Sequence, residues 1–429
     1  GGRRLAARGH VREGLATLNN GAKGITPWAA CRMWKETGTC SLLNGDPKDY
    51  ARRTSHRRYG ISALHTSQLY AWETADPRFD VTPQPDLPHL GHVQEPHRFG
   101  WVVEIDPFDP DSQPVKRTAF GRLCRECATL SLGTDGRMAY YSGDDTKGEY
   151  IYKFVPSGHF DPARPEASRQ LLDEGTLYVA RFDADGHGEW LALVHGQSGL
   201  TAENGFASQA EVLLNARAAA DQLGATPMDR PEWVAVHPQS REVYVSLTNN
   251  DRRGQKQPVD AANPRPENLH GQILRWNEQD ADPTATRFQW EIFLLAGEQP
   301  GARKPDGQPV PANLTGTIQG DIFSSPDGLA FDGAGRLWIE TDADEGLEAL
   351  QTIGCNQLLC ADPRTREVRR FLVGPRGCEI TGITWTPDYR SLWINVQHPA
   401  LSYPASDGQT RPRSTTVLIT KDDGGIIGS

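Results

Sequence analysis

Hydrophobic and polar positions along this chain repeat one pattern, in which two short apolar strands flank a tight turn. The pattern is clearest in GCEITGITWTPDYRSLWINVQHP at 377–399, where the turn is TPDYR. Three further stretches share the plan: RECATLSLGTDGRMAYYSGDD at 125–145, RPEWVAVHPQSREVYVSLTNN at 230–250 and SPDGLAFDGAGRLWIETD at 325–342. Short apolar runs bounded by Gly, Pro, Asp and Asn predict strands, and a pair of such runs predicts a β-hairpin.

Further strands follow the hairpins. Two apolar runs come after each of the first three hairpins and one after the fourth: EYIYKFV (149–155) and TLYVARFD (176–183), GQILRWN (271–277) and FQWEIFLLAG (288–297), NQLLCADP (356–363) and EVRRFLVG (367–374), and STTVLITKD (414–422). Four consecutive strands make one blade of a β-propeller. The pattern therefore predicts an all-β fold, a β-propeller with about five visible blades. An earlier strand, QLYAWE at 68–73, is expected to pair with GWVVEIDPF at 100–108.

The long segments between hairpins predict insertions. Residues 208–223, SQAEVLLNARAAADQL, are rich in Ala, start at a capping Ser and end before Gly224, so we expect one helix there. Residues 251–268 and 298–321 show no period and are expected to be loops. Long loops between blades usually cover one rim and carry function.

Composition and charge narrow the class of protein. In a chain of 429 residues, stacked repeats share a continuous core, so we expect one propeller domain at 59–429 and a poorly defined or disordered segment at 1–58. The 45 basic residues against 55 acidic ones give a net charge of −10, which disfavours nucleic acid and an anionic membrane as partners. No apolar run approaches the ~20 residues of a membrane span.

The cysteines do not follow the spacing of a structural zinc site. The chain has seven of them, at 31, 40, 124, 127, 355, 360 and 378. The pairs 124/127 and 355/360 lack the two matched knuckles that such a site needs. Buried thiols or one local disulfide are the two expectations.

One acid leads each hairpin at the same place. In a propeller the innermost strands border the central channel, so these carboxylates are expected to form a ring. A ring without cations repels itself and raises carboxyl pKa values, and calcium, magnesium, manganese or ferric iron would remove that repulsion. The alternative is that the acids cap turns or pair with the arginines at 122, 125 and 230. We expect the four acids to bind metal together: Glu126, Glu232, Asp327 and Glu379.

Arg230 stands two residues before Glu232 and therefore beside the predicted ring. A guanidinium is a bidentate partner for phosphate, although a surface salt bridge is the alternative. Several cations beside an arginine suit phosphoryl transfer. The pairs Asp144-Asp145 and Asn249-Asn250 close the second strand of their hairpins and are either metal ligands or turn formers. His398 either lines the channel or, as we favour, bonds a backbone carbonyl.

A series of longer motifs carries a family resemblance. They are TLNNGAKGITPW from Thr17, GWVVEIDPFDP from Gly100, VKRTAFGRLCRECATL from Val115, YYSGDDTKGEYIYKFV from Tyr140, LLDEGTLYVARF from Leu171, GATPMDRPEWVAVHP from Gly224, VYVSLTNN from Val243, and GCEITGITWTPD with VQHP near the end. In this order they cover most of residues 59–400. With them the chain resembles the PhoX-type alkaline phosphatases, a secreted bacterial family of phosphomonoesterases.

The resemblance implies a six-bladed β-propeller whose channel holds a cluster of iron and calcium. It implies hydrolysis of small phosphate esters, with Arg230 as the phosphate contact and, together with Glu126, as a catalytic residue. The implied metal ligands are the four hairpin acids at 126, 232, 327 and 379. A periplasmic or secreted location follows in the same way, and we expect a monomer without nucleic-acid or membrane partners.

The N-terminal part departs from the family pattern. After Thr-Pro-Trp the family continues to a Cys that ligates iron, and by counting that Cys falls on Trp34 here. Residues 29–56 depart as a block, which suggests a shifted reading frame, and no resemblance is recognisable upstream of Leu15. Arg125 and Cys127 replace the His and Gly that flank the family's Glu. We therefore expect a chain that is altered at 29–56 and truncated at its start.

Two other functions stay open at this point. The stretch at 325–342 also resembles repeats of calcium-dependent lactonases with a propeller fold. A lactonase needs one cation and has no need of Arg230. A degenerate propeller that only binds a ligand or calcium is the non-enzyme alternative.

Overall fold

The predicted hairpins form the framework of the fold. The computed structural model describes residues 4–6, 23–28, 31–33, 38–63, 66–67, 70–84, 86, 92–344, 352–399, 403–405, 407 and 409–429. Four antiparallel pairs correspond to the repeated pattern: β6 (Thr129–Leu132) with β7 (Met138–Gly143), β11 (Pro231–Val236) with β12 (Val243–Leu247), β16 (Pro326–Phe331) with β17 (Leu337–Thr341), and β20 (Glu379–Trp385) with β21 (Ser391–Gln397). All four hairpins are confirmed.

Outer strands complete each sheet. They are β8 (Ile151–Pro156), β9 (Gly175–Phe182), β10 (His187–Ala192), β13 (Gln272–Glu278), β14 (Arg287–Leu295), β15 (Gln319–Gly320), β18 (Gln357–Ala361), β19 (Glu367–Val373) and β22 (Thr415–Thr420). An N-terminal sheet has the order β1-β5-β4-β3-β2, with β1 at Arg4–Ala6, β2 at Lys23–Ile25, β3 at Cys31–Met33, β4 at Val102–Ile105 and β5 at Val115–Arg117. Pairing of β10 with β14 joins two blades into one nine-stranded sheet.

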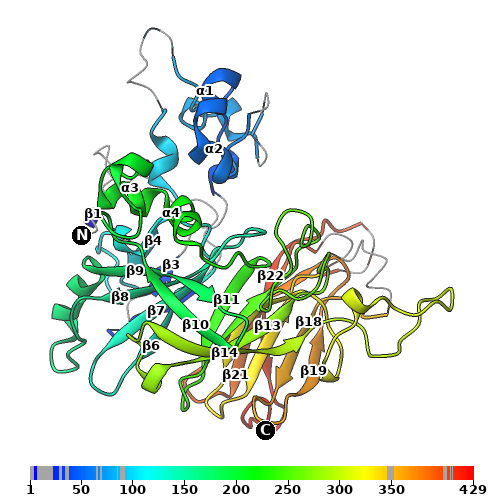
Figure 1. The fold of residues 1–429 in the computed structure, drawn as a ribbon. Helices are drawn as coiled ribbons and strands as arrows, with labels where there is room; N and C mark the ends of the chain where they lie inside the picture. The colour runs from blue at the N-terminus through cyan, green and yellow to red at the C-terminus, as the bar shows by residue number, and fades with distance from the viewer. Residues whose placement is uncertain are drawn as a thin grey trace.

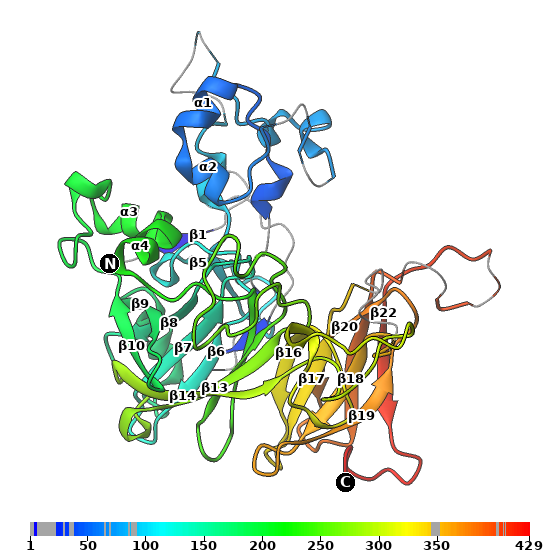
Figure 2. The same cartoon turned by 45° about the vertical axis from the view of Figure 1, so that its right-hand side comes forward.

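The sheets stand side by side as the blades of a β-propeller (Figures 1 and 2). The inner strands contact one another in the order β2, β6, β11, β16 and β20. Five blade-like units are therefore present in the described part of the chain, as predicted. Four of these units share one core that runs from Val102 in β4 through Tyr152 in β8 to Leu359 in β18, each fully buried. The last unit packs in a second cluster, in which Ile380 of β20 is buried together with Trp338 of the preceding unit. Together the two cores hold the inner strands, and hence the hairpin acids, in a fixed arrangement.

The predicted helix at 208–223 is confirmed, although it is broken into two. The segments are α3 (Gln209–Leu214) and α4 (Ala216–Leu223). Ser208 caps α3 by accepting the Glu211 N–H, and Gly224 ends α4 with a φ of 70°. The break falls at Asn215, whose side chain donates to the Glu211 carbonyl and so competes with the helical ladder.

The expected strand at 68–73 is wrong for residues 70–73, and residues 68–69 lie outside the described part of the chain. Residues Tyr70 and Ala71 have positive φ, and Trp72–Thr74 form a 3-10 turn. Strand β4 pairs with β3 and β5 instead. An apolar run with an internal Ala and two aromatics fits a strand pattern locally, but here the aromatics pack in the turn, with Trp72 against Phe79.

A small helical lobe stands apart from the blades and carries α1 (Pro47–Arg52) and α2 (Thr54–Arg58) (Figures 1 and 2). Its own core is small: Leu42, Ile61, Phe79, Val81 and Phe99. Residues 47–52 and 54–58, which fall within the segment expected to be poorly defined or disordered, are thus helical. Residues 1–3, 7–22, 29–30 and 34–37 lie outside the described residues, so the expected boundary between 1–58 and 59–429 stays a prediction.

Two further expectations concern thiols and membranes. Cys127 and Cys360 are free thiols, so the alternative of a local disulfide is wrong for the pairs 124/127 and 355/360. Among the described residues, no helix has the length and apolar character needed to cross a membrane.

Candidate metal centre

Two of the hairpin acids lie where the pairing of their strands is irregular. The pairing of β11 with β12 shifts register between Pro231 and Val234, so Glu232 lies in a bulge. The pairing of β16 with β17 shifts in the same way just after Pro326, which places Asp327 in an equivalent bulge. Bulges of this kind re-aim side chains and are common next to active sites.

The backbone just before these two acids is strained. Arg230 has a φ of 56° and Ser325 a φ of 52°, and each residue precedes the proline that starts its inner strand. Non-glycine residues rarely adopt this left-handed conformation, and such residues concentrate at ligand sites. The two blades therefore present their acids through the same unusual turn.

Three carboxylates from two blades meet at one point. One oxygen from each of Glu126, Asp145 and Glu232 lies within 4.8 Å of the others, and all three residues are buried. Gly143 makes this approach possible, because a Cβ there would lie 2.2 Å from the carbonyl oxygens of Pro231 and Glu232. The packing of β7 against β11 thus brings together acids that are far apart in the sequence.

Residues at the end of the second strand of three hairpins lie beside the hairpin acids. The N–H of Asp145 donates to the Cys124 carbonyl at 2.8 Å, and the N–H of Asp342 donates to the Ser325 carbonyl at 3.0 Å. Each acceptor lies two residues before its hairpin acid, so Asp145 and Asp342 occupy equivalent places. Thr248 takes the same place in the blade between them, with its N–H on the Arg230 carbonyl.

Sequence reasoning left Asp145 open between ligand and turn former, and it missed Asp342. The signal that could have found both is their shared position directly after the second strand of a hairpin. Asp144, by contrast, is structural, because it forms a buried ion pair with Arg217 of α4. Asn250 has a structural role as well, because its side-chain amide donates a hydrogen bond to Asp229 at 2.9 Å.

Among the acids of the candidate metal centre, Glu379 lies near Asp342. Its Oε2 accepts from Gln397 at 2.8 Å and lies 3.4 Å from His398 Nε2. The His398 ring thus lies beside the Glu379 carboxylate, and the favoured interpretation of His398 as a partner of a backbone carbonyl stays a prediction. The Glu379 carboxylate acts on the pKa values of both Asp327 and Asp342, which joins the fourth hairpin acid to the group.

Mutual repulsion is visible in the carboxyl pKa values. Burial, followed by the charges of Asp145, Asp327 and Glu126, raises the pKa of Glu232 well above its ordinary value. Burial and then Glu379 raise the pKa of Asp327 in the same way, and they raise that of Asp342 to about 6. Acids that resist ionisation together are the electrostatic mark of a cation site.

Arg230 lies within this group of acids. Its Nε donates to Asp145 Oδ1 at 2.7 Å, and its Nη2 donates to Asp145 Oδ2 at 3.0 Å and to Glu232 Oε1 at 2.8 Å. Burial opposes ionisation of Asp145, but this guanidinium outweighs it and holds the pKa of that carboxyl below its ordinary value. The other nearby arginines have different roles: Arg125 donates to the Phe120 and Gly121 carbonyls, and Arg122 stacks on Tyr59.

A family model described as alkaline phosphatase PhoX matches residues 4–400. The chain belongs to this family. The match also corrects the expectation that nothing upstream of Leu15 is recognisable, because the family model begins at residue 4. Membership makes the chain an alkaline-phosphatase-type phosphoric monoester hydrolase.

Solved structures agree with the family assignment. Pseudomonas fluorescens PhoX, in complex with vanadate as a transition-state analogue, is 43% identical with a TM-score of 0.87, covering 100% of this chain and 76% of that one. Aldose sugar dehydrogenase from Streptomyces coelicolor (10% identity, TM-score 0.31, covering 97% and 98%) and a gluconolactonase from Xanthomonas campestris (12%, 0.24, 69% and 76%) are far more distant and bear on neither fold nor function. Comparison with curated proteins gives no match.

Of the departures from the PhoX pattern, the one at Cys127 can be located. Cys127, which replaces a Gly of the family, is fully buried, and its Sγ accepts the Val234 N–H at 3.2 Å beside the Glu232 bulge. Trp34, on which the family's iron-ligating Cys falls by counting, lies outside the described residues. The shifted-frame hypothesis for 29–56 stays a prediction that DNA sequencing would test.

Proposed function

We propose that this chain hydrolyses phosphate monoesters at a cluster of iron and calcium held in the propeller channel by the four hairpin acids at 126, 232, 327 and 379. Asp145 joins them as a fifth ligand. The observation that carries the proposal is the meeting of three buried carboxylates, from Glu126, Asp145 and Glu232, beside the guanidinium of Arg230. The family assignment favours this function over the lactonase and non-enzyme alternatives.

The donor set fits hard cations. All the side chains of the group are carboxylates, and oxygen ligands suit calcium and ferric iron better than softer metals. Burial and mutual repulsion raise the pKa values of Glu232 and Asp327 although Arg230 lies beside them, so Arg230 compensates this negative charge only in part. When bound, the cations would supply electrophilic stabilisation of phosphate oxygens and a water activated at neutral pH.

Arg230 is suited to hold the phosphate group. Nε and Nη2 face the acids, whereas no group in the described part of the chain accepts a hydrogen bond from Nη1. The side chain keeps 22% of its surface exposed, so a substrate can reach it. Asp145 and Glu232 orient the guanidinium, which leaves a preformed donor for a phosphate oxygen. Glu126 completes the site from the neighbouring blade.

One experiment tests the function. Hydrolysis of p-nitrophenyl phosphate is measured with and without a chelator, next to elemental analysis of the purified protein and a parallel assay on a lactone. We expect chelator-sensitive phosphatase activity with iron and calcium bound. Lactone hydrolysis with calcium alone would overturn the proposal in favour of a lactonase, and bound metal without turnover would make the chain a binding protein.

We propose a periplasmic or secreted location and a monomeric state. The location is supported by the family, whose members are secreted phosphatases. Cell fractionation with activity measured in each fraction tests the location, and light scattering on the purified protein tests the oligomeric state. Activity confined to the cytoplasm, or a stable dimer, would contradict the respective proposal.

A further inference from the structure

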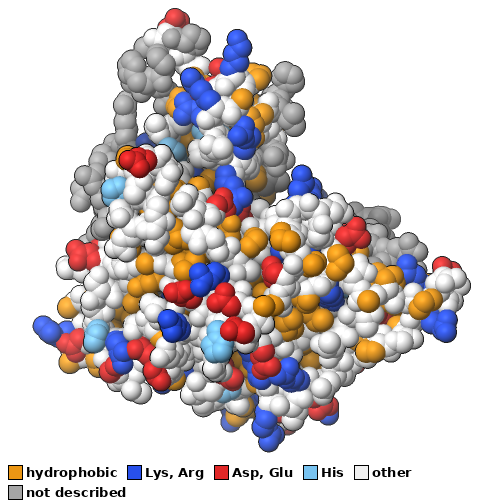
Figure 3. All heavy atoms as spheres, viewed as in Figure 1, with side chains coloured by type: hydrophobic (Ala, Val, Ile, Leu, Met, Phe, Trp, Pro, Cys, Tyr) orange, Lys and Arg blue, Asp and Glu red, His pale blue; other side chains and the backbone are white. Residues whose placement is uncertain are grey.

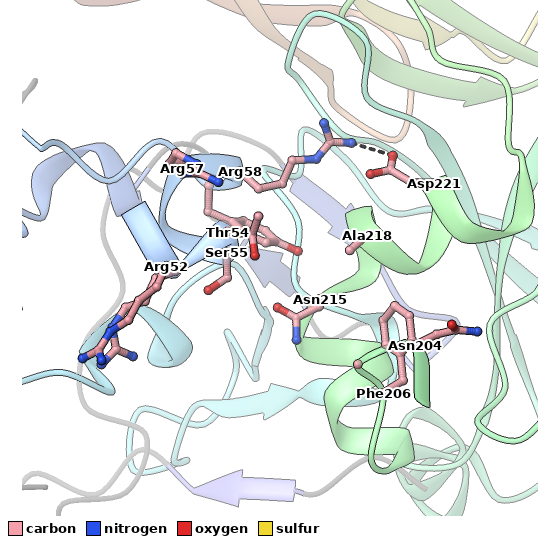
Figure 4. A pocket seen from close by; sticks show the side chains of 13 residues that line it. Arg52, Thr54, Ser55, Arg57, Arg58, Asn204, Phe206, Asn215, Ala218 and Asp221 are labelled. Carbon is pink, nitrogen blue, oxygen red and sulfur yellow. Dashed lines mark hydrogen bonds and ion pairs between the residues drawn. The ribbon is translucent and has the colours of Figure 1, made fainter. Parts of the chain in front are cut away.

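A groove separates the helical lobe from the inserted helices α3 and α4. Its volume is about 650 Å³. One wall carries four arginines of the lobe, at positions 52, 53, 57 and 58, and the other carries Asn204 and Asn215 (Figure 4). Cavities of a few hundred Å³ hold small organic ligands. None of the acids of the candidate metal centre lines this groove, so it is a separate feature of the molecule.

Positive charge in the groove exceeds the carboxylates that could neutralise it. Arg52 and Arg53 share the single carboxylate of Asp49. Arg58 pairs with Glu149 at 3.1 Å and with Asp221 at 2.8 Å. Arg57 is exposed, donates to the Ala51 carbonyl at 2.8 Å and has no ion pair within the described residues.

This concentration of positive charge is local. The whole chain carries a net charge of −10, yet basic side chains gather over the lobe in the space-filling view (Figure 3). Four arginines line the groove against the single lining carboxylate of Asp221, and an excess of one sign of charge raises the local concentration of oppositely charged ligands. The groove therefore favours anions.

Two hydroxyl groups add uncharged donors beside the arginines. Thr54 and Ser55 lie between Arg57 and Asn215, which faces them from the other wall (Figure 4). Neither hydroxyl has a hydrogen-bond partner in the part of the chain that the structure describes. Hydroxyls and guanidinium groups together match the three acceptor oxygens and the near-double charge of a phosphate monoester.

The remaining surface of the groove is partly apolar. Phe206, which is 5% exposed, and Ala218 line the wall opposite α2. An organic group attached to a phosphate can therefore rest on these side chains while its charged end faces the arginines. We propose that the groove is a binding site for a small organic phosphate, distinct from the candidate metal centre. The inference does not depend on the proposed hydrolysis.

Calorimetric titration with phenylphosphonate, which resists hydrolysis, tests the site. The titration is carried out on the purified protein and on a Glu232→Gln variant, so that binding at the metal centre is distinguished from binding in the groove. We expect one binding event to persist in Glu232→Gln. Loss of all binding in that variant would overturn the proposal, because the phosphonate would then bind at the acids only.

Charge substitutions show whether the binding event that persists in Glu232→Gln takes place in the groove. Arg57→Glu and, independently, Thr54→Glu should weaken the persisting event about tenfold or more, a factor that corresponds to roughly 1.4 kcal/mol. The matched control is Arg364→Glu, which reverses a charge on an arginine that is 88% exposed and lies outside the groove. Both lobe residues are exposed, so their variants are expected to fold.

Three results would contradict the assignment. Unchanged affinity in both lobe variants removes the site from the groove. An equal loss in Arg364→Glu shows that only the overall charge matters. Benzoate that binds as tightly as phenylphosphonate shows that the groove does not select phosphate.

Discussion

The guanidinium of Arg230 forms a bidentate ion pair with the carboxylate of Asp145, with Nε 2.7 Å from Oδ1 and Nη2 3.0 Å from Oδ2. Arg230 comes from the segment before β11, and Asp145 follows β7, so one contact joins two blades. The pair neutralises part of the charge of the acid group and fixes the direction of the guanidinium. The same contact therefore serves both the proposed cation site and the proposed phosphate contact.

Replacement of Arg230 should separate these two roles. We expect Arg230→Ala to lower kcat/KM for p-nitrophenyl phosphate by about 10²- to 10³-fold, the usual cost of losing one preorganised donor to a developing charge. Steady-state kinetics measure the loss, and Arg252→Ala, an exposed arginine nearby, is the control. An unchanged kcat/KM in Arg230→Ala would show that the guanidinium only stabilises the acids.

Glu379 tests whether the fourth blade contributes to metal binding. Glu379→Gln keeps the size of the side chain but removes the charge that acts on Asp327 and Asp342. We expect the variant to lose metal-dependent activity and part of its bound metal, measured by elemental analysis. Glu367→Gln, on the outer strand β19, is the matched control. Full activity and full metal content in Glu379→Gln would remove this residue from the site.

Asp342 should reveal the repulsion in the metal-free protein. Its pKa in the folded chain is about 6, above the ordinary 3.8. A carboxyl whose pKa is raised by folding stabilises the folded state fully below about pH 3.8. This stabilisation is lost as the pH rises through about 6. We therefore expect Asp342→Asn to raise the Tm of chelator-treated protein at pH 8, and the gain to shrink toward pH 4.5.

The matched control for this pH series is Asp362. The Arg364 backbone N–H holds the pKa of that carboxyl below its ordinary value, so its contribution is present at neutral pH and is lost as the pH falls. Asp362→Asn should accordingly lower the Tm at pH 8. A gain for Asp342→Asn that does not vary with pH would mean that ionisation of Asp342 is not the cause.

Gly143 tests the close approach of β7 to β11. An Ala at this position places a Cβ 2.2 Å from two carbonyl oxygens of the neighbouring blade, so the inner strand that carries Glu232 must move. We expect Gly143→Ala to cost about 1–3 kcal/mol of unfolding free energy, as for other overpacked sites, and to reduce bound metal. Denaturant unfolding and elemental analysis measure both effects.

Gly45→Ala is the control for this substitution, because its Cβ would meet only the Thr82 hydroxyl oxygen, at 3.4 Å. Equal stability of Gly143→Ala and the parent protein would show that the blades can separate without cost. A loss of stability with full metal content would limit the role of Gly143 to packing.

Much of the fold is predictable because it is local. The alternation of apolar runs and turn residues specified the four hairpins, and their outer strands followed from the same pattern. The strand prediction failed at residues 70–73 because a short apolar run does not show whether a partner strand is available, and β4 pairs with β3 and β5 instead. The break of the inserted helix at Asn215 depends on one side-chain contact with the preceding turn.

The hairpin repeat places an acid at the head of four inner strands and Arg230 beside one of them, so these residues could be identified from the sequence alone. That Asp145 meets both Glu126 and Glu232, and that Asp342 lies beside Asp327, is visible only in the folded chain. The first relationship arises where β7 packs against β11 of the next blade, and the second arises where the two strands of one hairpin pair. No local pattern encodes the distance between two blades, since it is set by the packing of their facing surfaces.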